Sequence, residues 1–109
     1  TVLREGKNPF GTMRLLVSRM PAAGALALRC GRGQVLTTRC WRRDDRLMLP
    51  DSRGERSVKR LLSERGIPPE KRETLPVFCV DGVLAAVWGV GVDRRFLPET
   101  SGENLYIIM

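Results

Sequence analysis

The chain has 109 residues, of which 42% are hydrophobic, and 19 Lys and Arg against 12 Asp and Glu give it a net charge of +7. This length predicts one domain or a piece of a longer protein, and no apolar run approaches the roughly 20 residues that cross a bilayer. Three cysteines without a Cys-x-x-Cys pair, together with the lack of histidine, argue against a disulfide scaffold and a structural zinc site. Free thiols and the lack of a signal-peptide pattern favour the cytoplasm.

The first half of the chain predicts three strands that are separated by turn residues. The apolar segments are residues 13–20, 25–30 and 34–41, with Pro21 and Gly24 between the first two. In the third strand, alternation places Val35, Thr37, Arg39 and Trp41 on one face and Leu36, Thr38 and Cys40 on the other. A polar loop is expected at residues 42–54.

One helix is predicted at residues 57–65. Val58, Leu61 and Leu62 form a single apolar stripe at i, i+3 and i+4. Ser57 suits the N-cap position, and Gly66 suits the left-handed position after the helix. Residues 69–72 begin with Pro69 and are expected to form a second, short helix.

The last third of the chain predicts an antiparallel hairpin and two further strands. Asp81-Gly82 is typical of a type I′ turn, so residues 76–80 and 83–88 are expected to pair. Gly89 and Gly91 favour a bend or bulge, followed by strands at 92–97 and 105–109. The pattern as a whole indicates an α+β domain, rich in antiparallel strands, with one or two short helices packed on it.

The positive charge is concentrated in the middle of the chain. Residues 29–72 contain thirteen Lys or Arg and six Asp or Glu, interleaved with apolar residues such as Trp41, Leu47 and Leu61. Charge of one sign on a folded surface attracts a polyanion, and nucleic acid is the polyanion that this pattern favours. The alternative is a basic surface that only keeps the chain soluble.

Four groups of residues between positions 34 and 97 resemble the C-terminal domain of bacterial tRNA(Ile)-lysidine synthetase. The family pattern opens with a strand and an Arg, Arg, Asp, Arg series, which this chain carries at Arg39, Arg42, Asp45 and Arg46. A helix start, an Ile-Pro turn before a Leu-Pro strand start, and a Gly-x-x-x-Asp-x-Arg-Phe ending follow in the family order at residues 57–62, 67–76 and 89–96. Arg43-Asp44 stands where the family has Pro-Gly, and Trp88 stands where it commonly has Pro.

The resemblance implies a parent enzyme that uses ATP to activate the wobble cytidine of an isoleucine tRNA and then joins lysine to it. The family carries out that chemistry, with its ATP and lysine, in an N-terminal domain with a Ser-Gly-Gly-x-Asp-Ser loop. This sequence has no such loop. No catalytic residue, cofactor or metal is therefore expected here, and the implied partners are the acceptor-stem region of the tRNA and the N-terminal catalytic domain.

The resemblance also implies boundaries and a fold. Residues 1–33 would be a variable lead-in with two strands, and residues 34–109 would be the tRNA-binding domain. The family fold is a β-rich sandwich with helices against it, similar to a domain of phenylalanyl-tRNA synthetase β chains.

Seven basic residues form the candidate RNA-binding set: Arg39, Arg42, Arg43, Arg46, Lys59, Arg60 and Arg72. Guanidinium groups bind phosphate oxygens in a bidentate manner, and A-form RNA offers its phosphates and 2′-hydroxyls rather than its deep groove. The alternative for the arginines is internal pairing with Asp44, Asp45 or Asp51, which would fix the loop. Arg72 is as well suited to bracing the chain, and Trp41 and Trp88 are expected as half-buried anchors more than as base-stacking platforms.

Two other functions remain open. In the first, the domain is a structural or assembly module that dimerises or docks other domains without contacting RNA. In the second, it is a free-standing enzyme, for which no nucleophile with a base and no carboxylate pair stands out in the sequence.

Overall fold

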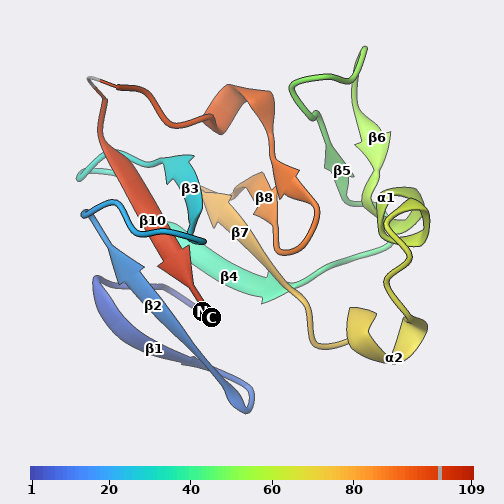
Figure 1. Ribbon diagram of the computed structural model, residues 1–109, viewed down its shortest axis with the longest axis horizontal. Coiled ribbons are helices and arrows are strands. Elements are labelled where there is room, and N and C mark those ends of the chain that lie inside the picture. Colours follow the sequence, from blue (N-terminus) through green and yellow to red (C-terminus); the bar gives the residue numbers. More distant parts are fainter. Residues whose placement is uncertain (101) are drawn as a thin grey trace.

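The computed structural model describes residues 1–100 and 102–109, and it contains two four-stranded antiparallel sheets (Figure 1). The first sheet has the strand order β1-β2-β10-β3. Its strands are β1 (Gly6–Phe10), β2 (Met13–Ser18), β3 (Leu26–Arg29) and β10 (Asn104–Ile108). The last strand of the chain therefore lies between two of the first three.

The second sheet has the strand order β4-β7-β8-β9. Its strands are β4 (Leu36–Cys40), β7 (Pro76–Val80), β8 (Val83–Val87) and β9 (Gly91–Val92). Between β4 and β7 the chain forms a two-stranded hairpin of β5 (Arg46–Leu47) and β6 (Arg56–Ser57), then α1 (Val58–Glu64) and α2 (Pro69–Arg72). A 3-10 turn, η1 (Arg94–Phe96), follows β9.

The second sheet lies between two apolar clusters. On one side, Phe78 and Val80 pack with Leu15 and Ile107 of the first sheet. On the other side, Val77 packs with the buried face of α1 and with the β5 region. All five residues of β7 are buried, as expected for a strand that is covered on both faces. Figure 1 shows the resulting order from left to right: first sheet, second sheet, then the β5–β6 hairpin with α1.

The predicted α+β class is confirmed, and so are most of the elements. The helix begins after the Ser57 cap and ends before Gly66, which has φ 69°. The β7–β8 hairpin turns at Asp81 and Gly82, whose φ values of 50° and 80° fit the predicted type I′ turn. In β4, Leu36 and Thr38 of one predicted face are buried, whereas Cys40, the last residue of the strand, is exposed.

Two local predictions differ from the structure, and one strand has no counterpart among the predictions. The strand predicted at 92–97 ends at Val92, because the Asp93 side chain accepts a hydrogen bond from the Arg95 N–H and starts the 3-10 turn. The loop predicted at 42–54 contains strand β5, which is only two residues long and carries no periodic signal. Strand β1 was not predicted, because it contains Gly6, Asn8 and Pro9, which are poor strand formers.

Candidate nucleic-acid interface

Helix α1 is held at both ends by its own sequence. The Ser57 hydroxyl accepts a hydrogen bond from the Arg60 N–H. At the other end, the N–H groups of Gly66 and Ile67 bond to the carbonyls of Ser63 and Leu62, which is the Schellman arrangement. Leu61 and Leu62 are buried against the second sheet, so the opposite face, with Lys59 and Arg60, is exposed.

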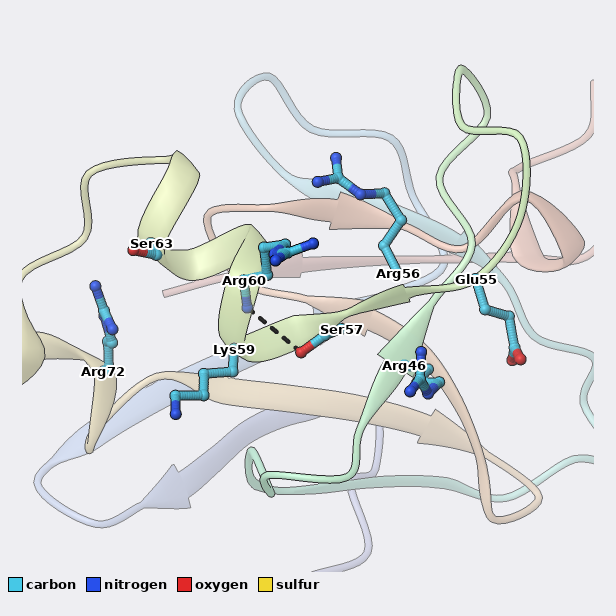
Figure 2. A pocket seen from close by; sticks show the side chains of 8 residues that line it. All are labelled: Arg46, Glu55, Arg56, Ser57, Lys59, Arg60, Ser63 and Arg72. Atoms are coloured by element: carbon cyan, nitrogen blue, oxygen red, sulfur yellow. Dashed lines mark hydrogen bonds between the residues drawn. The ribbon is translucent and has the colours of Figure 1, made fainter.

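Beside this exposed face lies a hollow of about 640 Å³. It is lined by residues of β5, β6, α1 and α2 and by the residue before β6: Arg46, Glu55, Arg56, Ser57, Lys59, Arg60, Ser63 and Arg72. We call it the basic groove. Figure 2 shows Lys59 and Arg72 towards its helical side and Arg46 on the neighbouring strand, next to Ser57. Arg46 and Ser57 are paired residues of the β5–β6 hairpin, so the hairpin brings Arg46 next to the start of the helix.

The basic groove has an excess of positive charge that is mostly free of ion pairs. Among the described residues, Arg46, Lys59 and Arg60 have no carboxylate within 4.0 Å. Arg56 is paired with Glu64, and both side chains are exposed. The Nε of Arg72 donates to the Ile67 carbonyl at 2.7 Å, which fixes its side chain beside the hollow. The cationic groups around this concave surface, together with the hydroxyls of Ser57 and Ser63, are suited to bind phosphate oxygens.

Arg39 is not part of this groove. Its two terminal nitrogens each donate to one carboxylate oxygen of Asp45 at 2.9 Å, and one of them also donates to the Cys40 carbonyl. This pairing raises the pKa of Arg39. Burial alone would raise the pKa of Asp45, but the hydrogen bonds from Arg39 and from the Arg42 N–H outweigh it, and the pKa lies below its ordinary value. Of the three acids that the sequence left open, Asp45 is the partner of Arg39.

Arg42 and Arg43 lie on the exposed turn between β4 and β5, outside the groove lining. The Arg42 N–H donates to Asp45 at 2.6 Å, and the Arg42 carbonyl accepts the Asp45 N–H. Neither side chain has an ion pair within the part of the chain that the structure describes. The structure thus gathers four of the seven candidate residues, Arg46, Lys59, Arg60 and Arg72, and leaves Arg39, Arg42 and Arg43 apart.

A second buried carboxylate, that of Asp93, contacts the residue after β5. Asp93 is fully buried, and its oxygens accept hydrogen bonds from the Met48 N–H, the Arg95 N–H and the Arg95 guanidinium at 2.9–3.0 Å. Burial by itself would raise the pKa of Asp93. The hydrogen bonds from these donors outweigh that effect, so the pKa of Asp93 lies below its ordinary value. The Arg95 pKa is raised by the same contact.

The aromatic and thiol groups are mainly structural. Trp41 is half-buried beside the α1 cluster and donates its indole N–H to the Arg72 carbonyl at 2.9 Å. Trp88 packs against the other cluster. Cys30 and Cys79 are buried, and burial raises the pKa of Cys30. Within residues 1–100 and 102–109, no group of three or more potential ligands is arranged to hold a metal ion, and no helix is long and apolar enough to cross a membrane.

Sequence reasoning missed Arg56, Ser63 and Glu55 as groove residues. Ser63 lies in the second turn of the helix and belongs to no motif. Glu55 and Arg56 precede the helix in a stretch whose sequence is typical of a polar loop. They reach the groove because Arg56 pairs with Leu47 in the β5–β6 hairpin. No local signal in the sequence predicts this pairing.

Comparison with known proteins places these features in a family. A family model described as the TilS substrate C-terminal domain matches residues 36–109. Two similar relatives are both named tRNA(Ile)-lysidine synthase. The one from Methylococcus capsulatus is 41% identical over 54 residues, which are 50% of this chain and 12% of the relative. The one from Nitrosomonas europaea is 34% identical over 75 residues, which are 69% of this chain and 16% of the relative. The chain therefore spans less than a fifth of the length of these curated relatives.

Proposed function

This chain belongs to the TilS substrate C-terminal domain family, and from that premise we propose that its basic groove binds the acceptor-stem region of an isoleucine tRNA. The observation that carries the proposal is the grouping of Arg46, Lys59, Arg60 and Arg72 around one hollow beside α1. These four side chains come from three separate elements, β5, α1 and α2, so the fold gathers them in space.

The groove suits a nucleic-acid backbone better than a small molecule. It is open and charged, and none of the residues that line it has an apolar side chain of the kind that encloses a small ligand. Phosphates are spaced regularly along an RNA strand, and A-form RNA presents them together with 2′-hydroxyls along its accessible surface. The lysine, arginine and serine side chains that line the groove can donate hydrogen bonds to these phosphate and hydroxyl oxygens.

The parent protein, in this proposal, is a cytoplasmic tRNA(Ile)-lysidine synthase. Its activity, with ATP and lysine as substrates, belongs to the longer part that the relatives have and this chain does not cover. The role of this domain is to hold the tRNA while the anticodon is modified elsewhere. Arg42 and Arg43, which are exposed on the turn next to β5 and lie outside the groove lining, are proposed as outer contacts.

The test is a titration of the chain with an isoleucine tRNA and with its acceptor-stem minihelix, each followed by gel shift at 50 and 200 mM salt. The four cations of the groove by themselves predict that log affinity falls with log salt with a slope of about three, at 0.7–0.9 per phosphate contact, and any contact by Arg42 or Arg43 would add to this slope. Over this fourfold change in salt, the affinity then falls by roughly a hundredfold.

Two double variants remove equal charge, one from the basic groove and one from the first sheet. Lys59→Gln with Arg60→Gln is expected to weaken binding strongly and to reduce the salt slope by nearly two units. Lys7→Gln with Arg14→Gln removes the same charge from exposed positions of the first sheet and serves as the control. Equal losses in the two double variants would mean that the attraction is unspecific. Negligible binding of the unchanged chain at 50 mM salt, together with a salt-resistant dimer in light scattering, would favour the assembly function.

A further inference from the structure

Two carboxylates are buried in the described part of the chain, and both contact the segment that carries Arg46. Asp45 is 8% exposed and Asp93 is 0% exposed, and they are the charged residues among the buried polar groups of that part. A buried carboxylate is costly unless it is paired and hydrogen-bonded, and replacing such a pair by apolar residues is often neutral for stability. Their common location therefore points to a role beyond general stability.

Asp45 holds the beginning of this segment. Its carboxylate binds the Arg39 guanidinium of β4 and the N–H of Arg42. Its carbonyl accepts the N–H of Val58, the first residue of α1, at 3.0 Å. One residue thus joins the end of β4, the turn before β5 and the start of the helix.

Asp93 holds the end of the same segment. Its carboxylate accepts the N–H of Met48, the residue after β5, at 3.0 Å. The Met48 carbonyl in turn accepts the N–H of Arg94 at 2.7 Å. The Arg95 guanidinium donates one hydrogen bond to each oxygen of the same carboxylate. Asp93 therefore joins η1 to the residue that follows β5.

We propose that the Arg39–Asp45 and Asp93–Arg95 pairs are positioning groups that clamp β5 from both ends and so fix Arg46 opposite Lys59 and Arg60 in the basic groove. The two-residue strand β5 has only the short β6 as a ladder partner, so its own pairing gives it little rigidity. The two ion pairs at its ends hold β5 in place more firmly than this short ladder can. Neither Asp45 nor Asp93 is required to touch RNA.

The proposal gives a shared role to two sequence motifs that lie about fifty residues apart. The Arg39, Asp45 and Arg46 series and the Asp93, Arg95 series both converge on β5. It rests on the proposed function of the groove, because the effect of the clamps is measured through tRNA binding.

The experiment compares Asp45→Asn and Asp93→Asn with the unchanged chain in the tRNA titration, at a temperature at which circular dichroism shows every variant to be folded. Each substitution keeps the shape and removes the charge of the clamp. The affinity is expected to fall roughly two- to thirtyfold, as for residues that act on a site without touching its ligand. Because Arg46 leaves its place, the salt slope is expected to fall by about 0.7–0.9.

The matched control is Asn8→Ala, which removes a buried polar side chain from β1 that bonds to Arg4 and Gly6. It lowers stability without approaching the groove, so both affinity and salt slope are expected to stay unchanged. If Asp45→Asn does not fold, Arg39→Lys takes its place in the experiment. This substitution keeps the positive charge but loses the bidentate guanidinium contact, and it is also expected to lower the salt slope.

The outcomes separate this inference from the proposed function. If Lys59→Gln with Arg60→Gln weakens binding while the clamp variants, once folded, bind with unchanged affinity and slope, the clamps only stabilise the fold and the inference is wrong. If the Lys59 and Arg60 variant also binds normally, the groove does not hold the tRNA and the proposed function fails first.

Discussion

The pairing of Arg39 with Asp45 predicts that two neighbouring arginines of the same motif differ sharply in their effect on stability. Arg39→Ala removes both guanidinium bonds at 2.9 Å and leaves Asp45, which is 8% exposed, with the Arg42 N–H as its remaining side-chain partner. Arg42→Ala removes an exposed side chain and keeps that N–H in place. The two substitutions change the net charge equally, so a difference between them reports the buried contact.

The magnitude follows from the burial of the pair. Removing one partner of a buried ion pair costs about 3–5 kcal/mol. The Arg39 side chain is 26% exposed, so solvent screens part of this interaction, and we expect about 2–4 kcal/mol. At about 4–5 °C per kcal/mol for a domain of this size, Tm falls by roughly 8–20 °C. Arg42→Ala is expected to stay within about 0.5 kcal/mol.

The assay is thermal unfolding followed by circular dichroism at pH 7 and at pH 3. The pKa of Asp45 is lower in the folded chain than in the unfolded chain. Its stabilising contribution is therefore complete above the unfolded pKa of about 3.9 and is lost as the pH falls through the lower folded value. The Tm gap between the unchanged chain and Arg39→Ala should narrow at pH 3. A gap below about 3 °C at pH 7, or one that widens in acid, would refute the reasoning.

Two further changes test other parts of the site. Gly66→Ala places a side chain at φ 69°, where nothing lies within 4 Å of the new Cβ, so any loss of stability comes from backbone strain alone. The free energy of unfolding in urea should fall by about 1 kcal/mol. An unchanged urea midpoint would contradict the left-handed cap. Glu64→Gln releases Arg56 from its exposed pair and should tighten tRNA binding in filter assays by about two- to fivefold, since such pairs contribute at most about 1 kcal/mol; weaker binding would show that Glu64 orients Arg56 usefully.

Elements whose determinants are close together in the sequence were predictable. Helix α1 is specified within ten residues by its cap, its apolar stripe and Gly66. The β7–β8 hairpin is specified by the two residues of its turn, Asp81 and Gly82. Both come from short-range chemistry that a single sequence contains.

The candidate site was less predictable, because its geometry depends on pairings between distant residues. Arg39 had three acids within reach along the sequence, and the choice of Asp45 is made by the tight turn in which the Asp45 N–H bonds to the Arg42 carbonyl. The inclusion of Arg56 depends on β5 pairing with β6. In the same way, the location of β10 between β2 and β3 joins ends of the chain that no local pattern relates.

The structure separates the arginines of one basic segment by the burial of the acids near them. Arg39 faces a carboxylate that is only 8% exposed, and releasing it would leave that charge without its bidentate partner. Arg56 faces the exposed Glu64, which water can solvate as soon as the pair opens. A phosphate can therefore replace Glu64 on Arg56 at little cost, whereas it cannot replace Asp45 on Arg39 without disturbing the turn and α1. Charge density in the sequence counts both arginines equally, but only Arg56 and the unpaired cations beside it are free to exchange partners.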